Sequence, residues 1–409
     1  MKGEKEIIID DYARHISPGK VDLYRKYGLL LVPRKRSGCY LQDREGKKYF
    51  NCHCNGGVFN LGHRNHAIIK ALTTGLKTYD IGNHHLISEP KTMLARALAE
   101  SLPRGLDQVV YGVSGGEAVD LAIKLARGVT GRGGIVSARG GYHGHTGFAL
   151  AAGDKKYREK FRPMAPGFSQ VPFDDTTAME KAVTQKTAAV ILETIPATMG
   201  IAVAENNYFR KVKEICQNQG ALLILDEVQT GFGRTGKLWG FEHFRVVPDI
   251  VVLGKGMSGG IYPMSATIFR STLASFFKDD PFIHISTFGG SEVGCFAALE
   301  TLRISREPGF LKNVKDIGAM LKKELGKLSR KYPRPGLSVR GLGLMMGLAF
   351  KDEITSLFML KLLFDRGIYL VYSGNDPRVL QFLPPLIMKE KDAAFLLKRI
   401  ESALKTVSG

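Results

Sequence analysis

The chain has 409 residues, 44% of them apolar, and a formal net charge of +19. This is the composition of an ordinary globular protein, and the length leaves room for two domains. No apolar run reaches the roughly 18 residues of a membrane span, and the polar N-terminus lacks the apolar stretch of a signal peptide. We therefore expect a soluble, cytoplasmic protein without a membrane partner. The basic residues stand in twos and threes without interleaved aromatic residues, which favours a solvated basic surface over a nucleic-acid partner.

Residues 1–65 combine a polar lead with two short strand-like pieces at 38–43 and 47–51, joined by the turn-prone Arg-Glu-Gly. Apolar and aromatic residues between turn signals predict a hairpin here. We therefore expect an N-terminal arm plus hairpin that forms part of a small domain.

Residues 66–305 alternate between helix-like and strand-like stretches. The helical patterns cover 91–101, 117–127 and 207–219. The apolar strand patterns cover 108–111, 134–138, 188–193, 221–226, 250–254 and 264–268. Strands and helices in turn over this length predict an α/β fold, with a mostly parallel sheet covered on both faces, as a large cofactor-binding domain.

Residues 306–409 have a different pattern. A long amphipathic helix at 312–331 is followed by a helix at 354–366, strands at 368–371 and 380–384, and a closing helix. We expect a separate, smaller α+β domain.

The cysteines do not predict a disulfide framework or a metal site. Their number is odd and their spacing irregular. Cys52 and Cys54 flank His53, but Cys-x-Cys lacks the zinc-finger spacing and no second pair follows. We expect no metal.

Two strand ends carry the most informative residues. Lys255 follows the apolar run Val-Val-Leu-Gly and precedes several glycines, and Asp226 ends Leu-Leu-Ile-Leu. An aspartate is often a mere helix cap and most lysines are solvated, but the glycine-rich continuation at 231–236 does not open a long helix. A lysine that forms a Schiff base and a carboxylate that keeps a pyridine nitrogen protonated predict a pyridoxal phosphate site.

Three further strand ends supply candidate cofactor contacts. Ser114-Gly115-Gly116 lies between a strand and a helix, where small residues expose backbone N–H groups to a phosphate. Tyr142 and His143 lie between glycines, and a tyrosine presented in this way can stack on a flat ring or simply plug the core. Glu193 ends another strand, where it could orient the phenolic oxygen of the cofactor or pair with an arginine.

Together these segments resemble the class III aminotransferases, a family of fold-type-I pyridoxal-phosphate enzymes. The resemblance spans nearly the whole chain, from Asn60-Leu-Gly-His63 through Leu225–Gly231 and Lys255 to Pro384-Pro385. It implies a mostly parallel seven-stranded sheet in the large domain, with a smaller α+β domain beside it.

The resemblance also implies residue roles. Lys255 would form the Schiff base and move a proton, and Asp226 would pair with the pyridinium nitrogen. Backbone N–H groups of Gly115 and Gly116 would bind the phosphate. The remaining cofactor contacts that it implies are Tyr142 and Val228 on the two ring faces, Gln229 at the phenolic oxygen, and Thr287 of the partner subunit at the phosphate. Such sharing implies a homodimer with shared active sites.

One departure from the family concerns the substrate. Where ornithine and 4-aminobutyrate aminotransferases have an arginine before Phe-x-Pro-Pro, this chain has Gln381, and a neutral amide cannot form a bidentate pair with a carboxylate. Arg378 lies at an odd offset and should face the other side of the strand. We expect Gln381 to hydrogen-bond Glu193 and activity with 2-oxoglutarate to be weak.

The preferred function is an aminotransferase acting between an amine or amino acid and an oxo acid. A racemase or epimerase, an aminomutase or a decarboxylase on the same scaffold remains the alternative, and a basic binding protein without activity is a third. The tentative substrate contacts are Val58, Phe59, Glu193 and Gln381, and the other candidates for the pocket wall are Tyr24, His84, His85 and Phe288.

Overall fold

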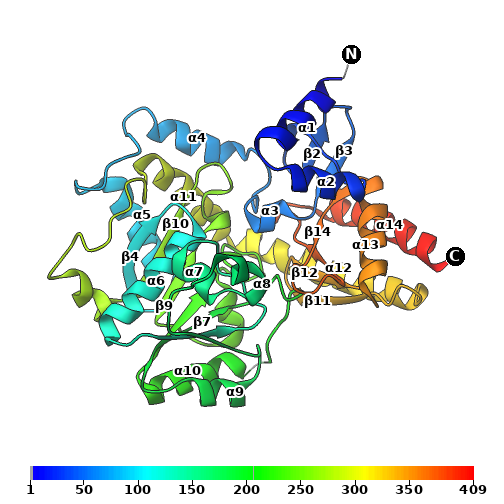
Figure 1. Cartoon of the computed structure of the whole chain (residues 1–409). Helices are drawn as coiled ribbons and strands as arrows, with labels where there is room; N and C mark the ends of the chain where they lie inside the picture. The colour runs from blue at the N-terminus through cyan, green and yellow to red at the C-terminus, as the bar shows by residue number, and fades with distance from the viewer. Residues whose placement is uncertain (1–2, 206) are drawn as a thin grey trace.

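The computed structural model describes residues 3–205 and 207–409, so the first two residues of the polar lead and residue 206 lie outside it. Its centre is a seven-stranded sheet in the order β4-β10-β9-β8-β7-β5-β6 (Figure 1). The strands are β4 Leu106–Gly112, β5 Gly134–Ala138, β6 Phe168–Val171, β7 Thr187–Glu193, β8 Leu222–Asp226, β9 Ile250–Leu253 and β10 Ser265–Arg270. Only β10 runs antiparallel to its neighbours, which confirms the predicted mostly parallel α/β sheet.

Both faces of this sheet are buried because successive side chains point to opposite sides. On β7, Val190 and Leu192 join one hydrophobic cluster, whereas Ile191 between them joins the other. Helix α6 (Gly115–Thr130) covers the second face. The first face is covered by α5 Glu89–Ala99, α9 Thr176–Ala182, α10 Tyr208–Gln219 and α11 Glu292–Ser305.

The sequence pattern missed β6. This strand has the sequence Phe-Ser-Gln-Val, lies at the sheet edge and pairs only with β5. Four residues with two polar ones among them leave too little apolar signal to predict a strand.

The C-terminal part forms a second sheet in the order β11-β12-β15-β14, at the right in Figure 1. Its strands are β11 Ser338–Leu342, β12 Met345–Ala349, β14 Val371–Tyr372 and β15 Val379–Phe382, and the helices packed with it are α12 Pro308–Lys331, α13 Glu353–Asp365 and α14 Glu390–Ser408.

The N-terminal hairpin packs with this C-terminal part. Strands β1 Pro33–Ser37, β2 Tyr40–Asp43 and β3 Lys48–Asn51 form a third sheet with β13 Ile368–Tyr369. The single strand expected at 368–371 is therefore wrong: it is split between β13 and β14, which belong to different sheets. Phe50 of the hairpin is fully buried in the same cluster as Leu321 and Leu363. The domain boundaries at 65 and 305 stay a prediction.

The polar lead contains two helices that the sequence analysis did not predict. These are α1 (Glu4–His15) and α2 (Pro18–Lys26), and Ser17 caps α2 by accepting from Lys20 N. Each buries only one residue, so their apolar periodicity is weak. In the described part of the chain, no helix has the length and apolarity that crossing a membrane requires.

Candidate functional site

Lys255 lies just beyond the end of β9 in a strained backbone conformation. Its φ is 41°, in the left-handed region that favours glycine, and it opens a short 3-10 turn, η3 (Lys255–Ser258). Strain of this kind persists where surrounding structure enforces it, often at functional sites. Burial lowers the pKa of the Lys255 amine, and the negative charges of Asp226 and Glu193 partly oppose this shift. The neutral, nucleophilic form of the amine is thereby favoured.

Asp226, at the end of β8, is held on both carboxylate oxygens. His143 Nδ1 lies 2.8 Å from Oδ2, and Val228 N donates to Oδ1 at 3.0 Å. Burial alone would lower the pKa of His143, but the hydrogen bond and the charge of Asp226 raise the pKa above its ordinary value. The histidine and the aspartate thus form a buried, charge-assisted pair.

Glu193 pairs in register with Asp226 on the neighbouring strand. Burial raises the pKa of Glu193 to about 7, while the charge of His143 lowers it and that of Asp226 raises it further. Its Oε1 accepts a hydrogen bond from Tyr142 N at 2.8 Å. Two adjacent strand ends therefore present two carboxyl groups to one space.

The glycine turn before α6 packs so closely against Thr146 and Val228 that it has no space for side chains of its own. A Cβ on Gly116 would lie 2.8 Å from Thr146 Oγ1, and one on Gly115 would lie 3.1 Å from Val228 Cγ1. Ser114 caps the helix by accepting from Glu117 N at 3.3 Å. Free N–H groups at the first turn of a helix of 16 residues attract a phosphate.

These groups surround a cavity of about 320 Å³. It brings together every predicted cofactor contact except Thr287. The predicted residues in its wall are Ser114, Gly115, Gly116, Tyr142, His143, Glu193, Asp226, Val228, Gln229 and Lys255. The sequence analysis missed Gly144, His145, Thr146, Ile195 and Thr230. A search for polar residues in the same loop as Tyr142 would have found His145 and Thr146.

The tentative substrate residues lie around this cavity rather than in its wall, Glu193 excepted. Val58 lines a neighbouring cavity of about 260 Å³ that also reaches Lys255. Phe59 lines another cavity of about 260 Å³, together with Tyr24 and His53. Thr287 is exposed and lies outside the cavity of its own chain, so its role stays a prediction.

The expected hydrogen bond between Gln381 and Glu193 is wrong. Gln381 is 7% exposed on β15, and its Nε2 donates to Ala197 O at 3.4 Å. Strand β15 pairs with β12 and β14, and this places the Gln381 amide at the loop after β7. Glu193 accepts a hydrogen bond from Tyr142 N instead. Arg378 is exposed and pairs with Asp376, its Nε 2.8 Å from Oδ1; it precedes β15, so the alternation expected along the strand does not apply to it.

This set of residues fits pyridoxal phosphate. Gly115 and Gly116 line the cavity at the start of α6, where backbone N–H groups can hold a phosphate, and an aspartate held by a histidine suits a pyridinium nitrogen. A lysine amine with a lowered pKa is suited to attack an aldehyde carbon. Within residues 3–205 and 207–409, no group of three or more His, Cys, Asp or Glu residues is arranged to hold a metal ion.

The fold and this site define a fold-type-I pyridoxal-phosphate enzyme. The chain belongs to the class III aminotransferase family, whose sequence profile matches residues 24–404. It is 50% identical to an uncharacterized aminotransferase of Archaeoglobus fulgidus over 100% of this chain and 96% of the relative. It is 35% identical to a putrescine aminotransferase of Pectobacterium atrosepticum, over 98% and 89% of the two chains.

Solved structures agree with this assignment. A thermostable (S)-enantioselective omega-transaminase from Thermomicrobium roseum has a TM-score of 0.89 at 28% identity, with 100% of both chains covered. The ornithine aminotransferase of Toxoplasma gondii, whose active site holds PLP at partial occupancy, has a TM-score of 0.87 at 26% identity, with 100% of this chain and 99% of that one covered.

The protein is accordingly an enzyme that uses pyridoxal phosphate to move an amino group between an amine or amino acid and an oxo acid. The family and the names of the relatives favour this activity over the racemase, aminomutase and decarboxylase alternatives, and over a binding protein without activity.

Proposed function

We propose that Lys255 is the catalytic residue that joins the cofactor and then moves the proton of the substrate carbon. Bound pyridoxal phosphate supplies an aldehyde for the amino group and a sink for the electron pair that the carbon leaves behind. Burial lowers the pKa of Lys255, which favours the unprotonated amine that both tasks require. The strained turn after β9 presents this amine at the cavity that Asp226 and Glu193 line.

In this proposal Asp226 keeps a proton on the pyridine nitrogen, and His143 is a positioning residue. The His143 ring fixes Oδ2 of the carboxylate, and Val228 N fixes Oδ1. Val228 and Tyr142 cover the two ring faces, and Gln229 reaches the phenolic oxygen. Gly115 and Gly116 hold the phosphate by backbone N–H groups, with Ser114 as the helix cap.

Thr146 has a role that the sequence analysis did not anticipate. The family often has a hydroxyl residue at the place of Gly116. Here Thr146 Oγ1 lies 2.8 Å from the position that a Cβ on Gly116 would take. We propose that this hydroxyl donates to the phosphate in place of the missing one.

The amino donor, in our proposal, is an amine without an α-carboxylate. The observation that carries this is Gln381, a neutral amide already engaged with Ala197 O where ornithine and 4-aminobutyrate aminotransferases have an arginine. The charged groups that act on Glu193 are His143, Asp226 and Lys255, and none is an arginine. A carboxylate next to the reacting amine would thus meet acids without a bidentate cation. The relative named putrescine aminotransferase points to the same class of donor.

The test compares putrescine with ornithine, which is the same diamine carrying an α-carboxylate. Each donor is mixed alone with the holoenzyme, and loss of the absorbance of the aldehyde form is followed. We expect kcat/KM for putrescine to exceed that for ornithine by at least about tenfold, and Gln381→Arg to narrow this ratio. Equal rates for the two donors, or robust reaction with glutamate, would contradict the proposal.

We also propose that the enzyme is a homodimer with shared sites. An exposed apolar patch joins the segments 76–93 and 282–288, which lie together at the left edge of Figure 1. The rings of His85 and Phe282 are 5.5 Å apart, and Asn83 Nδ2 donates to Glu292 Oε1 at 3.2 Å. The exposed apolar residues are Leu76, Ile81, Leu86, Ile87, Met93, Phe282, Ile283, Ile285 and Phe288. So many apolar side chains in one place mark an interface, and Thr287 lies within it.

A mixing experiment tests the sharing. Lys255→Ala and Thr287→Ala chains are coexpressed, and the heterodimer is isolated by two affinity tags. If Thr287 of the partner subunit serves the phosphate, one of the two sites is wholly intact and binds the cofactor with wild-type affinity, unlike either parent. A monomer in sedimentation analysis, or a heterodimer that binds no better than the Thr287→Ala parent, would contradict this.

We further propose that the protein resides in the cytoplasm. All five cysteines are buried and free, as a reducing compartment permits. Detection in a fractionated cell lysate checks this location.

A further inference from the structure

The β14–β15 loop (residues 373–378) of the C-terminal part contacts segments that follow strands β5 and β7 of the seven-stranded sheet. Lys156 of the short helix α8 (Lys155–Arg158) donates from Nζ to Gly374 O, and Asn375 N donates to Thr198 O at 2.8 Å. In Figure 1, α8 lies on the side of the large sheet that is turned toward the C-terminal part. The two parts of the molecule are therefore joined at this loop.

The side chain of Asn375 holds a carbonyl group in the turn before Tyr142. Its Nδ2 donates to Gly140 O at 2.7 Å, and Thr198 Oγ1 donates to the same oxygen at 2.9 Å. Two donors occupy both lone pairs of this carbonyl oxygen. Because Asn375 N also binds Thr198 O, both donors depend on the position of the β14–β15 loop.

The turn at Gly140 leads directly to the residues that we assign to the cofactor ring. Gly140 has a φ of 78°, and its N–H donates to Asp154 Oδ2 at 2.8 Å. Two residues later Tyr142 N donates to Glu193 Oε1, and His143 follows. A displacement of the Gly140 carbonyl would therefore reach Tyr142 and His143, and errors of about 1 Å at a reacting centre can cost about 100-fold in rate.

A second contact of the loop supports the ring of Tyr142 through Tyr157. The two rings are 5.3 Å apart, with an interplanar angle of 76°. A Cβ on Gly374 would lie 2.6 Å from Tyr157 Oη, so the loop backbone packs directly against that hydroxyl. The loop thus supports Tyr142 at its backbone, through Asn375, and at its ring, through Tyr157.

An apolar cluster keeps this junction in place. Ile195, Ala197 and Ile201, from the loop after β7, are buried together with Met345 and Leu383 of the C-terminal part. Ile195 also lines the catalytic cavity. Because close-packed side chains leave little room for movement, the C-terminal part has a fixed position relative to that cavity.

We propose that Asn375 is a positioning residue, which fixes the turn at Gly140 and with it the place of Tyr142 on the cofactor ring. Because His143 follows in the same turn, its contact with Asp226 is fixed as well. This rests on the proposed function, in which Tyr142 covers a ring face and His143 supports Asp226. Asn375 lies outside the wall of the catalytic cavity, so it acts through the turn and not by contact with the cofactor.

The first test removes the amide donor and keeps the size of the side chain. In Asn375→Asp the carboxylate cannot donate to Gly140 O, whereas the backbone N–H still donates to Thr198 O. The cofactor-free protein is titrated with pyridoxal phosphate, and the circular dichroism of the bound cofactor is recorded. We expect the affinity to fall about fivefold and the circular dichroism band to change, because Tyr142 no longer lies at its place on the ring. With a reacting amine, kcat should fall by a similar factor while KM stays nearly the same.

A matched control separates positioning from a general loss of stability. Asn313 Nδ2 donates to Leu386 O at 3.2 Å and to Met388 O at 3.1 Å, within the C-terminal part and away from the cavity. Asn313→Asp makes the same chemical change and should lower the unfolding free energy without altering the affinity or the circular dichroism of the cofactor. Denaturant titrations check that both variants fold. Equal changes in the bound cofactor in the two variants would overturn the proposal.

Gly374 provides a second variant, which adds no charge. In Gly374→Ala the new methyl group meets Tyr157 Oη, so the Tyr157 ring must shift against Tyr142. We expect weaker cofactor binding and an altered circular dichroism band, as in Asn375→Asp. Adding Tyr157→Phe removes the hydroxyl that the methyl group meets, and it should restore both properties to those of Tyr157→Phe alone. A Gly374→Ala variant that binds the cofactor normally, or that is not rescued, would overturn the contact at the ring.

Tyr142→Ala separates this proposal from the proposed function. If Tyr142→Ala binds the cofactor as tightly as the wild type, the assigned role of Tyr142 is wrong, and the positioning role of Asn375 falls with it. If Tyr142→Ala weakens binding but Asn375→Asp and Gly374→Ala do not, the positioning role is wrong and the role of Tyr142 stands.

A double variant completes the test when both single changes weaken binding. Tyr142→Ala combined with Asn375→Asp should lose less affinity than the product of the two single losses, because the amide then has no ring to position. A loss equal to the full product would show that Asn375 acts independently of Tyr142 and would overturn the proposal.

Discussion

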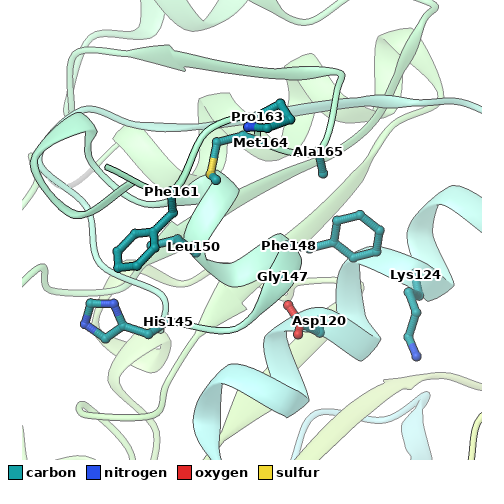
Figure 2. A pocket seen from close by; sticks show the side chains of 10 residues that line it. All are labelled: Asp120, Lys124, His145, Gly147, Phe148, Leu150, Phe161, Pro163, Met164 and Ala165. Atoms are coloured by element: carbon teal, nitrogen blue, oxygen red, sulfur yellow. The ribbon is translucent and has the colours of Figure 1, made fainter. Parts of the chain in front are cut away.

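The catalytic cavity and a second, outer cavity of about 660 Å³ that shares His145 with it are built in different ways (Figure 2). In the catalytic cavity the buried Asp226 and the partly buried Glu193 are both hydrogen-bonded, and two strand ends in register place them. In the outer cavity the wall is apolar with Asp120 as a carboxylate, and loops and helix faces form it. The groups that we assign to the cofactor chemistry thus lie at strand ends of the rigid sheet, whereas the outer cavity is formed by segments that vary more easily.

Changing Lys255 sharpens this comparison most. Lys255→Ala removes the amine that joins the cofactor and moves the proton, so we expect the rate with every donor to fall by at least about 10⁴-fold. Rapid-mixing measurements with short and long amines check this, and circular dichroism checks that the fold is kept. A rate close to that of the wild type with any donor would contradict the role of Lys255.

Asp226→Asn should have the next largest effect. It removes a buried charge held by His143, and we expect a loss of about 10²- to 10⁴-fold in kcat with all donors. The absorbance spectrum of the bound cofactor should change as well, since its ring nitrogen loses the paired carboxylate. Unchanged turnover would refute the role of Asp226.

His143→Gln should act through Asp226 and through the pKa of Glu193. With one of the two contacts to the carboxylate lost, we expect kcat to fall about tenfold and the pH profile of the rate to shift. The charge of His143 also lowers the pKa of Glu193, so its removal raises that pKa and displaces the profile to higher pH. A lower rate with an unshifted profile would indicate a purely structural role.

The smallest expected effect is that of Glu193 on the pH dependence of stability. Its pKa is raised by burial from the ordinary value to about 7, so the folded state favours the protonated form. The unfolding free energy of the cofactor-free protein should therefore fall as the pH rises from about 4.5 to about 7. Glu193→Gln keeps the acceptor for Tyr142 N and should lose this part of the slope. Denaturant titrations across that pH range measure the difference, and identical slopes would contradict it.

Local patterns predicted most of the large sheet and the core of the site. Short apolar runs ending in Asp226 or at Lys255 predict buried parallel strands, and parallel strands bring their carboxyl ends to one edge. Each of these residues could be placed without knowing the path of the loops between them. The segments that failed, such as β6 and the two N-terminal helices, are those that bury few apolar side chains.

Contacts between distant segments were not predictable in the same way. Gln381 was expected at Glu193 because both residues belong to the same site in the family, yet strand pairing sends its amide to Ala197. His145 and Asp120 drew no attention, because a histidine in a loop and an aspartate in mid-helix carry no spacing signal.

The sequence by itself determined the alternation of strands and helices, the lysine and the aspartate at strand ends, and hence the cofactor and the family. The contact of His143 with Asp226, the position of Thr146 against Gly116 and the second cavity lined by His145 follow only from the tertiary structure. The physical reason is range: periodicity and strand ends are local properties of the chain, while cavities and side-chain partners depend on how distant segments pack.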